Sequence, residues 1–126
     1  MNELISEFVL VNDNPDICEN WSRQLGSRLQ CFSNPQHLIE EVKKDPELAL
    51  RGKYILLDRY YDGMDLSDHK YLFEKIRSFF SESKIVLFSF RHSKGEKNPI
   101  RGIRFDDVIR SCPADKRRLR KYTDEF

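Results

Sequence analysis

The stretch from Lys53 to Asp65 has the sequence KYILLDRYYDGMD, and it decides the fold. Four consecutive apolar residues, Tyr54 to Leu57, lead directly into Asp58, and a turn rich in Asp and Gly follows. A short apolar run without alternation is typical of a strand that is covered on both faces, as in a parallel sheet. We therefore expect Asp58 at the carboxyl end of a central strand, the edge where open α/β sheets bind ligands.

Asp58 also has a second interpretation, because aspartate is a common turn residue. A strand-ending aspartate often has no function beyond the turn that it starts. An ionisable side chain at the ligand-binding edge of a sheet is, in contrast, a candidate site residue. Asp58 alone is therefore compatible with both a turn residue and a site residue.

The composition indicates a single globular domain. The chain has 126 residues, which is enough for one ordinary domain and too few for two. Hydrophobic residues make up 39%, and the 34% of charged residues nearly balance to a net charge of +1, so disorder is not expected. The start, MNELISEF, has no basic flank and the longest apolar runs have four residues, so we expect no export signal, no membrane segment and a cytoplasmic protein.

Cysteines and histidines are scattered along the chain. Cys18, Cys31 and Cys112 are odd in number and lack the spacing of metal or redox motifs, so we expect reduced thiols. The three histidines are equally dispersed. Neither residue type predicts a metal site.

Strands and helices are expected to alternate along the chain. Short apolar runs predict five strands, at residues 8–11, 29–32, 53–57, 84–89 and 107–111. Apolar residues at helical spacing predict helices that begin at Pro15 and Pro35, a helix with an apolar face from Tyr71 to Phe80, and a final helix over 114–126. The first helix should stop at Gly26 and the second before Pro46. Segment 91–104 contains two glycines and a proline, so a fourth helix there should be short or irregular.

This alternation predicts a flavodoxin-like α/β fold, with a five-stranded parallel sheet of order 2-1-3-4-5 and helices on both faces. In that order the first and third strands are neighbours, so Asp13 and Asp58 should face each other across a small cleft. Two close carboxylates repel each other, and a divalent cation or a proton relieves the repulsion. Mg²⁺ accepts one or two carboxylates plus a phosphate, and it would leave a carboxylate oxygen able to attack a phosphoryl group in line.

Four pieces of the sequence occur in the order and spacing of one family. They are FVLVNDNP at 8–15, ILLDRYYDGMDL at 55–66, IVLFS at 85–89, and SCP at 111–113 before the expected last helix. With these pieces the chain resembles the receiver domain of bacterial response regulators over nearly all of its length, which implies a single receiver-like domain over 1–126. The resemblance implies an atypical receiver in two-component phosphorelay signalling, with a histidine kinase or phosphotransfer protein as donor. It implies no enzyme activity beyond self-catalysed aspartyl phosphorylation and dephosphorylation.

The resemblance also implies roles for individual residues. Asp58 matches the phosphoacceptor, and Asp13 matches the acid that binds Mg²⁺ directly. Asn12 falls where the family usually has another acid, so its contact with the metal would be indirect. Tyr60 would offer its backbone carbonyl to the metal, and Ser89 matches the hydroxyl residue that hydrogen-bonds a phosphoryl oxygen.

Three departures from the family pattern concern the phosphoryl group. Cys112 stands before Pro113 where receivers place a lysine, and a thiol cannot supply the positive charge that pairs with a phosphoryl oxygen. Ile109 replaces the usual switch aromatic, and Phe90, where a small residue is usual, would crowd the entrance. Candidates to replace the lysine are Arg91, Lys94 and Arg110. A degenerate, phosphorylation-independent receiver acting as a protein-interaction adaptor therefore stays open as the alternative function.

Charge is distributed unevenly along the chain. Residues 91–121 carry eleven basic and four acidic residues, a net of +7, whereas the remaining residues have a net charge of −6. In receivers the last helices and the fifth strand form the surface for dimerisation and output, so we expect an acidic protein partner, or the acidic face of a second copy, on segment 91–121. A solvated helix face is the alternative. Nucleic acid is disfavoured, because no helix-turn-helix follows and the pI of 7.7 is unremarkable.

Overall fold

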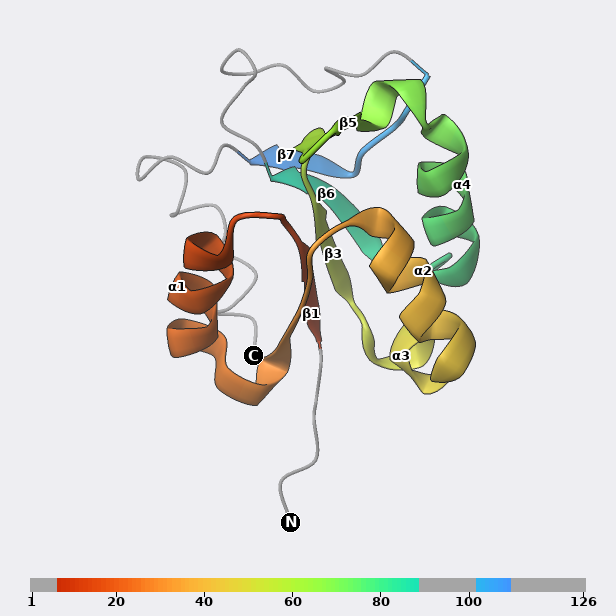
Figure 1. The fold of residues 1–126 in the computed structure, drawn as a ribbon. Helices are drawn as coiled ribbons and strands as arrows, with labels where there is room; N and C mark the ends of the chain where they lie inside the picture. The colour runs from red at the N-terminus through yellow and green to blue at the C-terminus, as the bar shows by residue number, and fades with distance from the viewer. Residues whose placement is uncertain (1–6, 89–101, 110–126) are drawn as a thin grey trace.

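In the computed structural model of the protein, the described residues are 7–88 and 102–109 (Figure 1). Of the expected features, Ser89, Phe90, Cys112, the final helix over 114–126 and most of segment 91–104 lie outside the described residues, as do the candidate lysine replacements. In the described ranges no helix is both long and apolar enough to cross a membrane.

A five-stranded parallel sheet forms the centre of the molecule. Its strands are β1 (Phe8–Val11), β2 (Leu29–Phe32), β3 (Tyr54–Leu57), β6 (Lys84–Phe88) and β7 (Asp107–Ile109). Their order in the sheet is β2-β1-β3-β6-β7, which confirms the predicted flavodoxin-like order. Val11 pairs with Phe32 on one side and with Leu57 on the other, so β1, β2 and β3 end at the same edge.

Helices cover both faces of the sheet, as predicted (Figure 1). Helix α1 (Pro15–Leu25) covers one face, and α2 (Pro35–Lys44), α3 (Glu47–Arg51) and α4 (Lys70–Phe79) cover the other. The apolar side chains of each strand alternate between the two faces and form two clusters, one under α1 and one under the other helices. The central strands β1 and β3 are apolar along their whole length because both of their faces are buried.

The sequence also predicted where the first two helices begin and end. Asn14 and Asn34 cap α1 and α2 with their side-chain oxygens, and a proline follows each cap. Helix α1 ends at Gly26, which has a φ of 55°, a value that favours glycine. Helix α2 ends before Pro46.

Two local predictions about helices were wrong or incomplete. The short helix α3 was not predicted, because five residues are too few to show a helical period. Tyr71 was placed on the apolar face of its helix, but it is 61% exposed. The buried face of α4 consists of Leu72, Phe73 and Ile76, and Tyr71 lies to the side of that stripe.

The expectation of reduced thiols is wrong for two of the three cysteines. Cys18 and Cys31 form a disulfide, with 6.3 Å between their Cα atoms. Cys18 precedes Trp21 by three residues and so shares the sheet-facing side of α1. Cys31 follows Leu29 by two residues and so shares the same face of β2. The disulfide therefore ties α1 to the edge strand β2.

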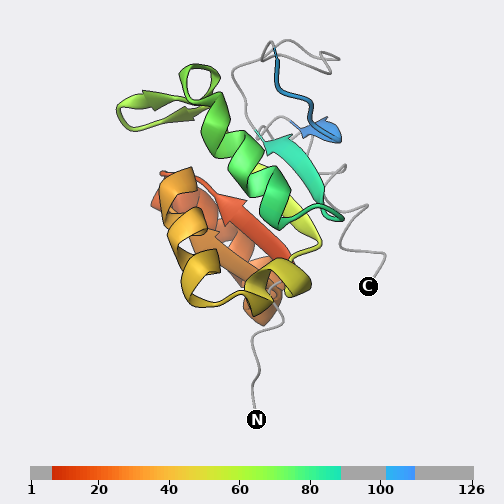
Figure 2. The ribbon, with the colours of Figure 1, turned by 90° about the vertical axis from the view of Figure 1, so that its right-hand side faces the viewer.

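A small antiparallel hairpin lies beyond the carboxyl end of β3. Strand β4 (Tyr60–Tyr61) pairs with β5 (Met64–Asp65), and a 3₁₀ turn at Leu66–Asp68 leads into α4. Gly63 in the connecting turn has a φ of 73°. Figure 2 shows this hairpin projecting beyond the sheet, next to the edge where β1 and β3 end.

Candidate functional site

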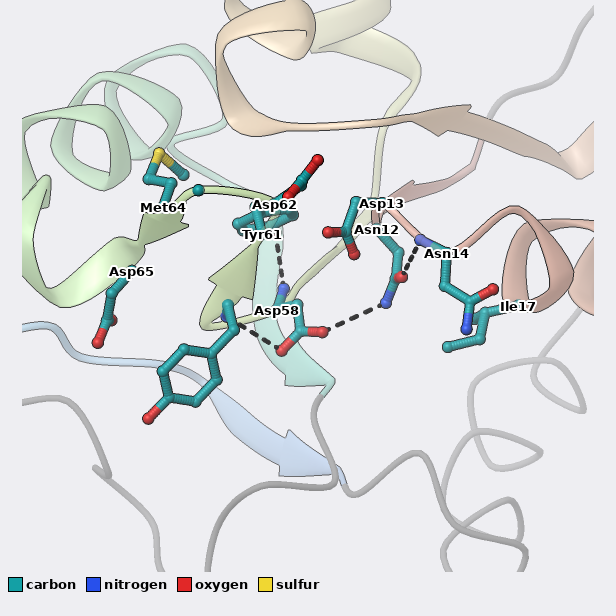
Figure 3. A pocket seen from close by; sticks show the side chains of 11 residues that line it. Asn12, Asp13, Asn14, Ile17, Asp58, Tyr61, Asp62, Met64 and Asp65 are labelled. Atoms are coloured by element: carbon teal, nitrogen blue, oxygen red, sulfur yellow. Dashed lines mark hydrogen bonds between the residues drawn. The ribbon is translucent and has the colours of Figure 1, made fainter.

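A pocket of about 750 Å³ opens at the carboxyl edge of the sheet (Figure 3). Its walls come from the turn after β1, the start of α1, the end of β3 and the β4–β5 hairpin. The lining residues are 12–14, Ile17, Asp58 and 60–65. The pocket thus brings together residues that are more than forty positions apart in the sequence.

Asp58 lies at the floor of this pocket and is half-buried. Its Oδ1 accepts hydrogen bonds from the backbone N–H of Arg59 at 2.6 Å and of Tyr60 at 3.5 Å. Its Oδ2 accepts a long hydrogen bond of 3.4 Å from the Asn12 side-chain amide. These donors hold the carboxylate with one oxygen against the backbone and the other toward the residues that follow β1 (Figure 3).

Asn12 is held rigidly beside Asp58. It is 7% exposed, and its backbone N–H donates to the Phe32 carbonyl at 2.9 Å. Its side-chain oxygen accepts a hydrogen bond from the Asn14 N–H at 2.8 Å. Because the oxygen is bound to the backbone, the amide nitrogen faces Asp58 and supplies a donor where an acid would have added a further negative charge.

Asp13 is exposed, and its side chain lies on the pocket wall between Asn12 and the hairpin (Figure 3). The structure therefore places Asn12, Asp13, Asp58 and Tyr60, four of the predicted site residues, around one pocket. Ser89, the remaining predicted site residue, lies outside the described residues.

Tyr61 is a pocket residue that the sequence analysis missed. Its hydroxyl accepts a hydrogen bond from the Asp58 N–H at 2.8 Å and donates one to the Val11 carbonyl at 3.0 Å. Burial raises the pKa of this phenol well above its usual value, and the charges of Asp58 and Asp13 add to the increase. The hydroxyl is therefore neutral and able to donate. The Asp62–Gly63 dipeptide was the available signal, because Asp-Gly between apolar residues predicts a two-residue hairpin turn.

The hairpin that carries Tyr61 is held by an ion pair across its base. The Arg59 guanidinium contacts the Asp65 carboxylate at 3.2 and 3.4 Å, and it lies 5.0 Å from the centre of the Tyr60 ring. Asp65 also accepts hydrogen bonds from the N–H and hydroxyl of Ser67 at 2.9 and 2.8 Å. Although burial raises the pKa of the Asp65 carboxyl, the Arg59 and Ser67 donors together hold it below its usual value.

Solved structures with a similar fold were found, whereas the sequence matches no protein-family model and no curated protein. The chain is similar to a response regulator protein from Burkholderia pseudomallei with a phosphorylated aspartic acid, calcium ion and citrate, with a TM-score of 0.68 and 12% identity over 89% of this chain and 63% of that chain. It is also similar to the Vibrio cholerae chemotaxis protein CheY4, with a TM-score of 0.68 and 13% identity over 93% of this chain and 95% of that one. The receiver domain of the hybrid histidine kinase CckA gives a TM-score of 0.64 and 14% identity over 94% and 95%. The chain has the fold of a response-regulator receiver domain.

The receiver fold accounts for the position of the pocket. Asp13 and Asp58 follow β1 and β3, which are neighbours only because the strand order reverses at β1. Open α/β sheets bind ligands at this reversal, outside the carboxyl ends of the strands. The pocket therefore occurs where the fold itself leaves a crevice.

The groups around the pocket fit a hard divalent cation. Asp13 and Asp58 bring two carboxylates to the pocket, Tyr60 lies on its wall, and the Asn12 side-chain amide contacts Asp58. Mg²⁺ prefers oxygen ligands, needs only one or two carboxylates and keeps several waters. Within residues 7–88 and 102–109, no group of three or more His, Cys, Asp or Glu side chains is arranged to hold a metal ion.

Proposed function

We propose that this protein is an atypical response-regulator receiver in two-component phosphorelay signalling, and that it accepts a phosphoryl group on Asp58 with the help of Mg²⁺. The observation that carries the proposal is the shared pocket of Asp13 and Asp58 at the ends of two adjacent parallel strands. The receiver fold supports it, because it makes this pocket the expected ligand site.

The proposed reaction needs little from the protein beyond position and charge. One oxygen of the Asp58 carboxylate attacks the phosphorus of a phosphohistidine in line, and a P–O bond forms as the P–N bond breaks. The leaving imidazole nitrogen keeps the electron pair of the broken bond. Bound Mg²⁺, held by Asp13, Asp58 and the Tyr60 carbonyl, would supply positive charge to the phosphoryl oxygens. Ser89 is proposed to donate its hydroxyl hydrogen bond to one of these oxygens.

The departures from the family pattern set the expected properties of the phosphorylated state. Asn12 contributes an amide instead of an acid, so the pocket has one negative charge fewer for holding a cation. Cys112 cannot replace the missing lysine charge, so phosphoryl stabilisation should be weaker unless Arg91, Lys94 or Arg110 reaches the site. We expect slow phosphorylation by small-molecule donors and a requirement for millimolar Mg²⁺.

The partners follow from the same proposal. A histidine kinase or phosphotransfer protein would donate the phosphoryl group in the cytoplasm. The basic segment 91–121, with a net charge of +7, would pass the state on to an acidic protein or a second copy. Such binding should weaken between low and high salt.

The test is phosphorylation by acetyl phosphate or phosphoramidate with Mg²⁺, followed by intact mass. A single phosphate adduct is expected on the wild type, and none is expected after chelation of Mg²⁺ or in Asp58→Asn. Asp62→Asn is the matched control, because Asp62 is another carboxylate of the same pocket and has no proposed role. An unmodified wild type, or an adduct that survives Asp58→Asn, would contradict the proposal.

A phosphorylation-independent adaptor is the second candidate, and the Asn12–Asp58 contact favours it. The Asp58 carboxylate accepts hydrogen bonds from Asn12, Arg59 and Tyr60, so the protein's own donors partly compensate its charge. The loss of the lysine at Cys112 points the same way. Partner binding that Asp58→Asn retains, and that no phosphodonor changes, would establish the adaptor function.

A further inference from the structure

Tyr61 occupies an unusual position between the two strands that carry the candidate ligands. In the sheet, Val11 of β1 pairs with Leu57 of β3 in the last step of the ladder. One residue further along, the Asp58 N–H donates to the Tyr61 hydroxyl, and that hydroxyl donates to the Val11 carbonyl. The phenol oxygen therefore links β3 to β1 one residue beyond the last backbone pair of the sheet.

This bridge lies directly between the backbone segments that position the two carboxylates. Val11 is two residues before Asp13, and the bridged amide belongs to Asp58 itself. The Tyr61 side chain is 6% exposed, so water cannot easily replace its hydroxyl as the link. Both hydrogen bonds are short enough to be strong, at 2.8 and 3.0 Å.

The ring of Tyr61 is itself fixed from outside the sheet. Tyr61 pairs with Met64 in the hairpin, and the Arg59–Asp65 ion pair closes the base of that hairpin. The Leu66 N–H donates to the Arg59 carbonyl at 2.7 Å, which anchors the hairpin to the start of the turn before α4. The Tyr61 side chain is therefore buried and held in one position by the hairpin.

We propose that the Tyr61 hydroxyl is a positioning residue that sets the separation of the Asp13 and Asp58 carboxylates by bridging the ends of β1 and β3. The inference rests on the proposed function for its consequence, which is a pocket arranged for Mg²⁺ before the ion arrives. Tyr61 touches neither the phosphoryl group nor the metal in this account. It acts through the backbone of Asp58 and Val11.

Tyr61→Phe and Tyr54→Phe form a matched pair for the test. Tyr54 is also buried, 7% exposed, but it lies at the opposite end of β3, where its ring stacks on Phe8. Each change removes one hydroxyl and keeps the ring. Only Tyr61→Phe is expected to weaken Mg²⁺ binding, by about fivefold in the dissociation constant, the equivalent of one neutral hydrogen bond. Isothermal titration with MgCl₂ on folded protein measures it.

A second measurement needs no metal. In Tyr61→Phe the Asp58 amide loses its acceptor, so its hydrogen exchange is expected to rise by about tenfold or more relative to Ile55 on the same strand. In Tyr54→Phe the exchange of the Asp58 amide should equal that of the wild type.

A third measurement keeps the Tyr61 hydroxyl. When 3-fluorotyrosine is placed at position 61, its fluorine resonance should shift on Mg²⁺ binding, whereas the resonance of the same probe at position 54 should not.

The outcomes separate this inference from the proposed function. Wild-type protein that shows neither saturable Mg²⁺ binding nor a phosphate adduct would overturn the proposed function and, with it, the consequence drawn for Tyr61. Wild-type protein that binds Mg²⁺, with Tyr61→Phe equal to Tyr54→Phe in affinity and in Asp58 amide exchange, would overturn the positioning role alone. A fluorine resonance at position 61 that Mg²⁺ leaves unshifted would also overturn it.

Discussion

The two ends of strand β3 differ in the charged groups that lie beside them. At the amino end, an aromatic stack is covered by a pair of opposite charges. At the carboxyl end, the carboxylates of Asp13 and Asp58 share one pocket with those of Asp62 and Asp65, and neutral amides donate hydrogen bonds to Asp58. Opposite charges in contact attract each other, whereas like charges brought together repel each other until a ligand compensates them.

The contacts at the amino end illustrate the stabilising arrangement. The rings of Phe8 and Tyr54 stack with 5.0 Å between their centres. Arg28 lies 5.3 Å from the centre of the Phe8 ring and contacts Glu7 at 3.6 Å. Substitutions at this end should therefore lower stability and leave ligand binding unchanged, whereas substitutions at the carboxyl end should abolish or weaken ligand binding without lowering stability.

Asp58→Asn is expected to have the largest effect, which is complete loss of the phosphate adduct. The same substitution should raise the free energy of unfolding by on the order of 1 kcal/mol, because it removes the repulsion between Asp58 and Asp13. Intact mass and urea unfolding, followed by the fluorescence of the single tryptophan, Trp21, measure the two effects. A strongly destabilised variant would show that Asp58 is a structural residue, and the contrast between the two ends would disappear.

Phe8→Ala tests the amino end and should lower the free energy of unfolding by about 3–5 kcal/mol. The ring is fully buried, and its removal leaves a cavity beneath Tyr54 and Arg28. The Mg²⁺ dissociation constant of the folded variant should stay within about twofold of the wild type, because the pocket lies at the other end of the strand. A large change in Mg²⁺ affinity with little loss of stability would reverse the assignment of the two ends.

The Cys18–Cys31 disulfide stabilises the sheet edge next to the pocket without contributing a ligand. The cysteines are 13 residues apart, and a loop of this size is worth about 3 kcal/mol when closed. Cys18→Ser, or reduction of the wild type, should lower the free energy of unfolding by that amount and leave phosphorylation by acetyl phosphate intact. Cys112→Ser serves as the control, and a loss of stability there equal to that of Cys18→Ser would argue against the pairing.

Asp65→Asn should have the smallest effect, a loss of about 0.5–1 kcal/mol near neutral pH. Asparagine keeps an oxygen that can accept from Ser67 and removes only the charge that pairs with Arg59. Because the pKa of Asp65 is lower in the folded state, its contribution is present above the usual carboxyl value of 3.8 and is lost as the pH falls below it. Unfolding curves of variant and wild type should therefore converge in acid.

Glu47→Gln is a suitable control for that series. Glu47 pairs with Arg51 at 3.6 Å, but its side chain is 80% exposed. Its removal should change little at any pH. A difference between Asp65→Asn and the wild type that persists in strong acid would show that the ion pair is not what holds the hairpin.

The sequence was sufficient for the sheet and for the acids at its edge. Runs such as FVLV and YILL can be strands only if both of their faces are covered, which requires a parallel sheet with helices on each side. The position of Asp13 and Asp58 then follows from strand order alone. The predicted neighbours Asn12 and Tyr60 reach the same pocket for the same reason.

What the sequence did not reveal depends on contacts between elements. The role of Tyr61 requires its hydroxyl to meet an amide of one strand and a carbonyl of another, and no periodic pattern encodes that meeting. The disulfide depends on which faces of α1 and β2 carry the two cysteines, and an odd number of cysteines at irregular spacing gave no indication of the pairing.

The most direct test of the account is a crystal structure of the protein with Mg²⁺ and beryllofluoride, a mimic of the phosphoryl group. We expect one metal ion in contact with the carboxylates of Asp13 and Asp58 and with the backbone carbonyl of Tyr60. The beryllofluoride is expected on the Asp58 carboxylate. A pocket that stays empty at saturating concentrations of both, or a metal that binds away from Asp13 and Asp58, would contradict it.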